Sequence, residues 1–262
     1  MALEAWDSGN AYEQYVGRWS RRIAVEFLHW LALPQRLGWA DIGCGTGALT
    51  AAIAANCRPS SVHGIDSSNA FISLARQHLG DGRVGFGQGD AAHLPCKAAS
   101  FDAVVSGLVL NFVPDHQSMI GEMVRVTKPG GVVAVYVWDY AGGMEMMRLF
   151  WDAAVAASPN GALLDEATRF PLCRPEPLGS LFENGGLKAV EVRAIEIATI
   201  FQNFDDFWRP FLGNVGAGPV YLAGVGDETR ERIRLSLEKQ LAVAPGGRIE
   251  LSARAWAVRG VV

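Results

Sequence analysis

The sequence Ala40-Asp-Ile-Gly-Cys-Gly-Thr-Gly47 has three glycines within five residues. It continues the apolar run from Leu37 to Ile42 and leads into an alanine-rich segment with a helical pattern. A glycine-rich loop between a strand and a helix lets the backbone turn tightly and approach a ligand, while the first N–H groups of the helix stay free. We therefore expect this loop to contact a cofactor.

Short apolar runs alternate with helical patterns around this loop. The pattern predicts helices at 47–57, 68–79 and 115–128, the last ended by Lys128-Pro-Gly-Gly131. It predicts strands near 37–42, 61–66, 84–88, 102–107 and 131–138. Repeated strand–helix units are typical of an α/β protein with a doubly wound, mostly parallel sheet.

The flanking segments complete one predicted domain, 1–262. Residues 11–33 carry aromatic side chains at helical spacing, which suits either a packing helix or a lid. Residues 158–180 are rich in Pro and Gly and predict loops, while 187–201 and 249–261 predict strands and 203–212 and 228–243 predict helices. We expect a helical lid at 1–35, a cofactor-binding core at 36–140, and substrate-side helices and C-terminal strands at 141–262.

Composition narrows the class of partner. The chain has 262 residues, half of them apolar, and a formal net charge of −4 without a long Lys/Arg run, which argues against nucleic acid as the main partner. The four cysteines have no C-x-x-C spacing, and no His/Asp/Glu cluster has metal-ligand spacing, so no metal is expected.

No apolar run approaches the roughly 20 residues that span a bilayer. With its polar, acidic N-terminus, the chain is expected in the cytoplasm. Its oligomeric state is not indicated.

The glycine loop alone is compatible with two cofactors. Gly43, Gly45 and Ala48 also fit the dinucleotide pattern G-x-G-x-x-A, so an NAD(P)-dependent oxidoreductase is an alternative. Asp41, however, stands at the strand end just before the glycines. A carboxylate there would repel a pyrophosphate but can orient the ammonium of a methionine moiety. The sequence therefore favours S-adenosyl-L-methionine.

Two further acids end the next predicted strands. Asp66 follows the run from Val62 and could accept both ribose hydroxyls, although with Ser67 and Ser68 it could instead cap the following helix. Asp90 could accept a hydrogen bond from the adenine amine while the Ala91 amide addresses the ring. Ligands of such sheets bind at the carboxyl ends of the strands, which gives the three acids a common edge.

The order of these motifs resembles the class I methyltransferase family, particularly the small-molecule branch that includes the ubiquinone and menaquinone biosynthesis methyltransferases. The resemblance covers roughly Gly38 to Trp138 and includes Asp41 to Gly47, Ile65-Asp66-Ser67, Gly89-Asp90-Ala91, Phe101 to Phe112 and Lys128-Pro-Gly-Gly131. It implies a Rossmann-like sheet of seven strands with an antiparallel last strand. It also implies a tyrosine-containing N-terminal helix over the cofactor and cofactor contacts after the fourth strand. The expected cofactor-binding residues are Tyr15, Asp41, Gly43, Cys44, Gly45, Asp66, Ser67, Asp90, Ala91, Ser106 and Leu108.

Methyl transfer from a sulfonium needs no dedicated catalytic residue, because positioning in a dry pocket can supply much of the rate. A base would help with a phenol, enol or protonated amine, and the candidates are His116, Asp139 and Tyr140, with Glu145 nearby in the sequence. His116 also fits a solvated residue at a helix start. We expect methyl transfer to an O, N or C atom of a small, partly apolar acceptor. A module that binds S-adenosylmethionine without catalysis is the other alternative.

Overall fold

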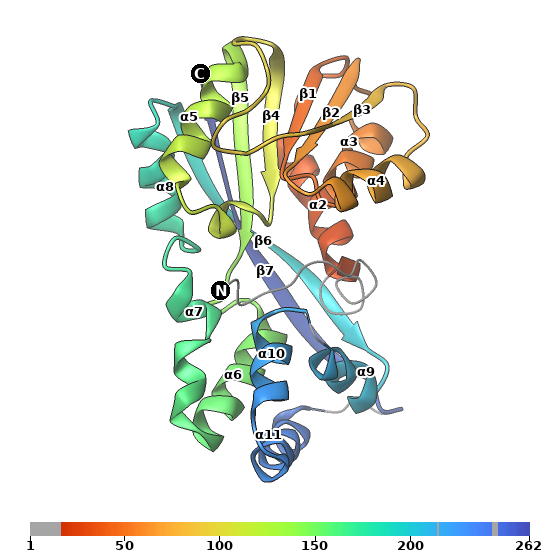
Figure 1. Ribbon diagram of the computed structural model, residues 1–262, viewed down its shortest axis with the longest axis vertical. Coiled ribbons are helices and arrows are strands. Elements are labelled where there is room, and N and C mark those ends of the chain that lie inside the picture. Colours follow the sequence, from red (N-terminus) through yellow and green to blue (C-terminus); the bar gives the residue numbers. More distant parts are fainter. Residues whose placement is uncertain (1–16, 214, 243–245) are drawn as a thin grey trace. The chain divides into compact units, whose positions relative to one another are not determined.

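A seven-stranded sheet organises the chain in the computed structural model, which describes residues 17–213, 215–242 and 246–262 (Figure 1). The strand order is β3-β2-β1-β4-β5-β7-β6. The strands are β1 (Gly38–Ile42), β2 (Ser61–Asp66), β3 (Val84–Gln88), β4 (Phe101–Gly107), β5 (Thr127–Trp138), β6 (Lys188–Phe201) and β7 (Ile249–Val261). All seven were predicted, and the α/β fold class is confirmed.

Strands β1 to β5 pair in parallel, so their carboxyl ends share one edge of the sheet. Strand β1 lies between β2 and β4, with Asp41 opposite both Gly64 and Val105. Strand β2 pairs with β3, and β4 with β5. The short runs of β1 and β4 are mostly buried, as expected for parallel strands covered on both faces.

Strand β7 runs antiparallel to β5, as the resemblance implied. The N–H of Gly130 donates to the carbonyl of Val262 at 2.9 Å, and the N–H of Asp139 donates to the carbonyl of Arg254 at 2.9 Å. Residue numbers therefore rise along β5 while they fall along β7, which is the antiparallel arrangement.

The Lys128-Pro-Gly-Gly131 segment was predicted wrongly as a helix end. Helix α5 (His116–Val126) has already ended, and β5 begins at Thr127. Phe101 pairs with Thr127 but Ala103 pairs with Val132, so the extra residues of β5 form a bulge. Gly130 has a φ of +76° within it, a conformation that favours glycine.

The chain divides into two compact units. The first holds the described residues of 17–19 with 138–171 and 196–254, and the second holds 20–137, 172–195 and 255–262. The domain boundaries expected at residues 36 and 141 stay predictions.

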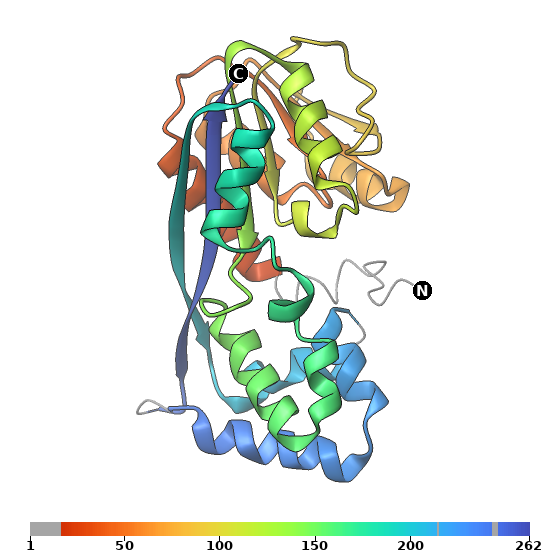
Figure 2. The same cartoon turned by 90° about the vertical axis from the view of Figure 1, so that its left-hand side faces the viewer.

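The second unit contains the predicted helices around the glycine loop. They are α2 (Arg18–Leu31, from Ser20 onward), α3 (Ala48–Asn56), α4 (Asn69–His78) and α5. The unit also contains α8 (Pro175–Asn184), which packs against α5 (Figure 2). The prediction of loops throughout 158–180 was wrong here. Pro175 occupies the first turn, where proline is tolerated, and Leu178 and Phe182 bury one face of the helix.

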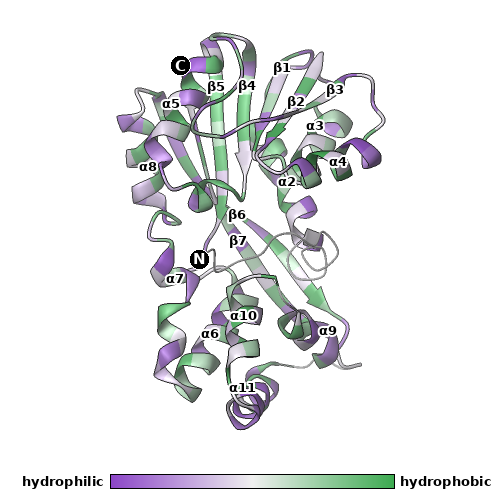
Figure 3. Cartoon of the chain, in the orientation of Figure 1, coloured by the Kyte–Doolittle hydropathy of each residue, from purple (hydrophilic) through white to green (hydrophobic). Residues whose placement is uncertain are grey.

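The first unit is mainly helical. It contains α6 (Glu145–Ala157), α7 (Glu166–Arg169), α9 (Phe204–Trp208), α10 (Ala217–Gly224) and α11 (Asp227–Gln240), with the 3-10 turns η3 (Pro159–Leu163) and η4 (Arg209–Leu212). Its core stacks aromatic rings, as between Phe150 and Phe211, whose centroids are 4.3 Å apart. Helix α11 is largely hydrophilic (Figure 3) and buries Ile233 and Leu237.

Candidate cofactor site

The loop between β1 and α3 has the backbone conformation for which its glycines are needed. Gly43, Gly45 and Gly47 have φ angles of +72°, +53° and +91°. The N–H groups of Gly43 and Cys44 both donate to the carbonyl of Ile65, at 2.7 and 3.0 Å. A Cβ on Gly43 would collide with Val109, whereas a Cβ on Gly45 would meet no atom of another described residue within 4 Å. The loop is thus anchored to β2 and open at Gly45.

Asp41 is the buried acid beside this loop. It is 1% exposed, and its Oδ2 accepts a hydrogen bond of 2.6 Å from the Thr50 hydroxyl. Its Oδ1 is buried and has no hydrogen-bond partner in residues 17–213, 215–242 and 246–262. Burial raises the pKa of Asp41 to about 7, the Thr50 hydrogen bond opposes the rise, and the charge of Asp66 adds to it. A cationic donor brought to Oδ1 would satisfy this oxygen and favour the ionised form.

Asp66 connects the end of β2 to the glycine loop. Its Oδ2 accepts from the N–H of Gly45 at 2.9 Å, and its Oδ1 from the N–H of Ser68 at 2.8 Å. The cap of α4 is Ser68, whose hydroxyl accepts from the Phe71 N–H at 3.3 Å, so Asp66 is not the cap itself. Its carboxylate keeps further lone pairs for a ligand. The predicted ribose contact stays a prediction.

The end of β3 lies beside that of β2. The N–H of Gly89 donates to the carbonyl of Asp66 at 3.0 Å, which places Asp90 and Ala91 next to that strand end. The exposed Asp90 carboxylate accepts from the Ala92 N–H at 2.9 Å. Ser67 is exposed at the start of the turn after β2, and its carbonyl accepts from the Gln88 side chain.

The segment after β4 packs on the glycine loop. Ser106 is fully buried and its hydroxyl donates to the carbonyl of Ile42 at 2.7 Å, so its side chain joins β4 to β1. Leu108 has a φ of +62°, rare for a residue with a side chain, and its N–H donates to the carbonyl of Tyr136.

Asn111 follows in the 3-10 turn η2 (Leu110–Phe112). It is 6% exposed, and within the described part of the chain neither its amide nitrogen nor its amide oxygen has a hydrogen-bond partner. Asn111 is not among the site residues predicted from the sequence, although one amide within the apolar run from Leu108 to Phe112 was a signal.

The proposed bases fall into two groups. His116 opens α5 in the second unit; it is half-buried, and this burial lowers the pKa of its imidazole. Asp139, Tyr140 and Glu145 belong to the first unit. Glu145 accepts from the N–H of Ser252 at 2.6 Å.

Asp139 is buried and its carboxylate is already engaged. It accepts from the N–H groups of Gly142 and Gly143 at 3.2 and 2.9 Å. The guanidinium of Arg254 approaches the same carboxylate at 2.6 Å. Nε of the same guanidinium also donates to it, at 2.8 Å, and with four contacts in place the carboxylate is poorly placed to act as a base.

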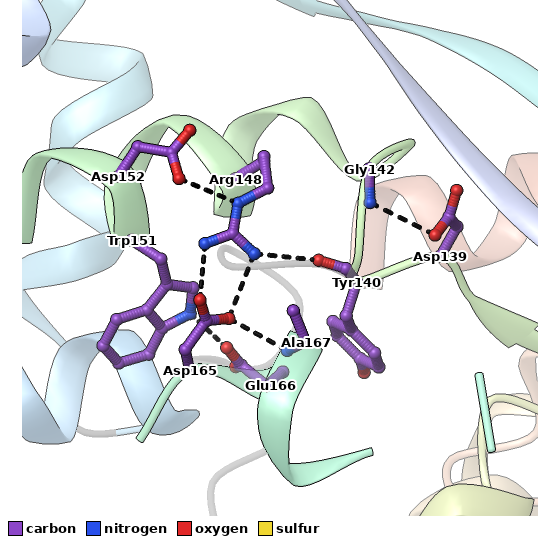
Figure 4. Close-up of polar contacts among 9 residues, drawn as sticks. All are labelled: Asp139, Tyr140, Gly142, Arg148, Trp151, Asp152, Asp165, Glu166 and Ala167. Carbon is purple, nitrogen blue, oxygen red and sulfur yellow. Dashed lines mark hydrogen bonds and ion pairs between the residues drawn. The ribbon is translucent and has the colours of Figure 1, made fainter. Parts of the chain in front are cut away.

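A polar network adjoins Tyr140 in the same unit (Figure 4). Arg148 donates to the Tyr140 carbonyl at 3.1 Å and holds Asp165 through two nitrogens, at 3.1 and 2.5 Å. The buried Glu166 accepts from the indole N–H of Trp151. The ring of Tyr140 packs against Phe170. Sequence patterns gave no indication of this network.

The second unit thus brings together most of the predicted site residues. They lie at the carboxyl ends of β1 to β4 and comprise Asp41, Gly43, Cys44, Gly45, Asp66, Ser67, Asp90, Ala91, Ser106 and Leu108. Tyr15 lies outside the described residues. The ligand contacts of all these residues stay predictions. Within the described ranges, no group of three or more His, Cys, Asp or Glu side chains could hold a metal ion. Among the same residues, no helix has the length and hydropathy needed to cross a membrane.

Comparison with known proteins gives consistent results. A family model described as a methyltransferase domain matches residues 40–135. A demethylmenaquinone methyltransferase of Bacillus subtilis is 39% identical over 169 residues, which cover 58% of this chain and 71% of the relative. A trans-aconitate 2-methyltransferase of Methylobacterium radiotolerans is 33% identical over 165 residues, 59% of this chain and 62% of the relative. This chain spans between 36% and 62% of the length of the first four curated relatives it matches.

The fold also matches a solved structure. Phosphoethanolamine N-methyltransferase 2 of Haemonchus contortus, in complex with phosphomonomethylethanolamine and S-adenosylhomocysteine, aligns with a TM-score of 0.60 at 18% identity. The alignment covers 98% of this chain and 57% of that one. At this identity the match shows a shared fold.

Proposed function

Because the chain belongs to the class I S-adenosylmethionine-dependent methyltransferases, we propose that it transfers a methyl group from S-adenosyl-L-methionine to a small, partly apolar acceptor. The observation that carries the proposal is the buried Oδ1 of Asp41, which no described residue contacts through a hydrogen bond and which lies beside a glycine loop that is open at Gly45. Buried polar atoms are rarely left unpaired, and a ligand ammonium is a fitting partner for this one.

The remaining residues of the site fit the other parts of the same cofactor. Asp66 is fixed by the Gly45 and Ser68 N–H groups and would accept from the ribose hydroxyls. Asp90 and the Ala91 amide would bind the adenine. When bound, S-adenosylmethionine supplies a methyl group on a sulfonium, and a neutral thioether is the leaving group. The contribution of the protein is to hold the acceptor in line and to exclude water.

Where the acceptor must lose a proton, we assign its acceptance to His116 in preference to Asp139. Burial lowers the pKa of His116, which keeps the imidazole neutral and able to take a proton near neutral pH. Asp139 is held by Arg254 and two backbone N–H groups. Tyr140 and Glu145 stay candidates.

The names of two relatives, demethylmenaquinone and trans-aconitate methyltransferases, support a small-molecule acceptor and leave its reacting atom open. The net charge of −4 supports a partner other than nucleic acid, and a cytoplasmic location stays part of the proposal.

Calorimetric titration of the full chain with S-adenosylhomocysteine and, separately, with NADH tests the cofactor. We expect binding of S-adenosylhomocysteine and none of NADH. The opposite result would replace the proposal with an NAD(P)-dependent oxidoreductase.

Incubation with methyl-labelled S-adenosylmethionine and a small-molecule extract then tests catalysis. Cofactor binding without transfer to any component of a broad extract would favour a non-catalytic binding module.

A further inference from the structure

Asn111 carries a buried side-chain amide in the turn after β4. Its nitrogen and its oxygen are both buried without a hydrogen-bond partner among the described residues, and the residue is 6% exposed. Its neighbour Leu110 is fully buried, whereas Phe112 on the other side is 38% exposed. Burying an amide without partners is costly, and proteins retain few such groups. A leucine of similar size would avoid this cost. The presence of an amide therefore suggests that a ligand supplies its hydrogen-bond partners.

The position of Asn111 connects it to the cofactor site. It lies in η2, directly after the strand β4 that pairs with β1. Val109, two residues earlier, fills the space where a Cβ on Gly43 would stand. Leu108, between β4 and this turn, has the strained φ of +62°. Strain of this kind persists where the surrounding structure holds a residue in place, often at a ligand site.

The chemistry of the amide selects among ligand groups. The Asn111 side chain offers two N–H donors and one acceptor oxygen. A carboxylate could satisfy only the donors, and an ammonium could satisfy only the oxygen. A hydroxyl both accepts and donates, so it alone of these three pairs with both ends of the amide. The carboxyl ends of the neighbouring parallel strands also carry Asp66 and Asp90, whose charges disfavour an anionic group.

We propose that Asn111 binds a neutral hydroxyl group of the methyl acceptor, so that the protein prefers phenols, enols or alcohols to carboxylates and amines. The inference rests on the proposed function, since it places the acceptor at the same strand ends as the cofactor. Asn111 is then a specificity-determining residue, and Asp41 keeps its separate role toward the ammonium of the cofactor.

The test uses three ring compounds that differ in their polar group: phenol, benzoate and benzylamine. Their binding to the full chain, saturated with S-adenosylhomocysteine, is measured at millimolar concentration by ligand-observed NMR. Asn111→Leu removes the amide at nearly constant size. Asn184→Leu, which replaces an exposed asparagine of α8 in the same unit, is the matched control. The affinity for S-adenosylhomocysteine and the Tm of the ligand-free protein are measured for each variant.

We expect wild type and Asn184→Leu to bind phenol more tightly than the other two probes. Asn111→Leu should lose about tenfold in phenol affinity, because a site built for a hydroxyl discriminates through those hydrogen bonds. It should keep the wild-type affinity for S-adenosylhomocysteine. Its Tm should rise, because an unpartnered amide no longer has to be buried.

Three results would overturn the inference alone: no preference for phenol in wild type, an unchanged preference in Asn111→Leu, or a lower Tm of that variant. A loss of about tenfold or more in its affinity for S-adenosylhomocysteine would also overturn it, since Asn111 would then bind the cofactor. Failure of the wild-type protein to bind S-adenosylhomocysteine at all would instead reject the proposed function, and the inference with it.

Discussion

Asp41 is a buried carboxyl group to which the described residues offer one hydroxyl donor, that of Thr50, and no counter-ion. The folded state therefore favours its protonated form, with a pKa of about 7 against an ordinary value of 3.8. The stability that this proton binding gives is complete below the ordinary pKa and is lost as pH rises toward about 7. A cation bound beside Asp41 would therefore stabilise the ionised carboxylate, which burial destabilises.

Replacing Asp41 by Asn should remove this pH dependence. We expect Asp41→Asn and wild type to have similar free energies of unfolding near pH 4, and the variant to be more stable at pH 8 by on the order of a few kcal/mol. Urea denaturation of both proteins without cofactor, at several pH values, measures the difference. A difference that stays constant across this range would mean that Asp41 is not a buried acid with a raised pKa.

Asp66 is the second acid with a distinct expected role. Asp66→Ala should weaken S-adenosylhomocysteine binding by about 1 to 3 kcal/mol, because charge-assisted hydrogen bonds to the ribose are lost. The Tm should also fall, since the N–H groups of Gly45 and Ser68 lose their acceptor. Asp81→Ala is the control, because Asp81 pairs with Arg83 before β3, away from the carboxyl ends of the strands. Calorimetry showing equal affinities for all three proteins would rule out the ribose contact.

At the scale of elements, the glycine loop offers a comparison of two alanine substitutions at positive φ. Gly45→Ala should fold with a cost of about 1 kcal/mol and bind S-adenosylhomocysteine poorly, because the new methyl group enters open space on the ligand side. Gly43→Ala should be much less stable, because its methyl group would lie 2.5 Å from a Val109 methyl. Thermal unfolding and calorimetry separate the two effects. Unimpaired binding by Gly45→Ala would show that the ligand approaches elsewhere.

The strands could be predicted from the sequence because each is a short apolar run bounded by turn residues, as in Val62 to Asp66. The helices α6, α8 and α10 were missed, and for α8 and α10 the reason lies in their local sequence. Pro175 and Pro177 made α8 resemble a loop, and α10 contains Pro219 and is buried on most sides, so it lacks an amphipathic pattern. The Lys128–Gly131 bulge depends on pairing with β4, which no local pattern encodes.

The site shows the same limit. Asp41 and Asp66 could be found because parallel strands bring their carboxyl ends to one edge. The engagement of Asp139 by Arg254 could not, since the two residues are 115 positions apart and meet through the antiparallel strand β7. Asn111 could not be identified as a site residue from the sequence, because the lack of a hydrogen-bond partner depends on the surrounding residues and not on Asn111 itself.

At the scale of the whole molecule, the cofactor residues and the Arg148 network belong to different units. Arg148→Met should lower the free energy of unfolding by about 2 to 4 kcal/mol, because Asp165, which is largely buried, loses its ion pair. Affinity for S-adenosylhomocysteine should be retained. Arg232→Met, which removes an exposed arginine bonded to the Ala157 carbonyl, should change stability little. Equal urea midpoints for the two variants would contradict a structural role for the Arg148 network.

We propose that the carboxyl ends of β1 to β3 bind S-adenosylmethionine, and a crystal structure of the complex with S-adenosylhomocysteine would show whether this claim holds. We predict the ligand ammonium within hydrogen-bonding distance of Asp41 Oδ1, the ribose hydroxyls on Asp66, and the adenine beside Asp90 and Ala91. A ligand bound at another part of the chain, with Asp41 Oδ1 still unpartnered, would contradict the claim.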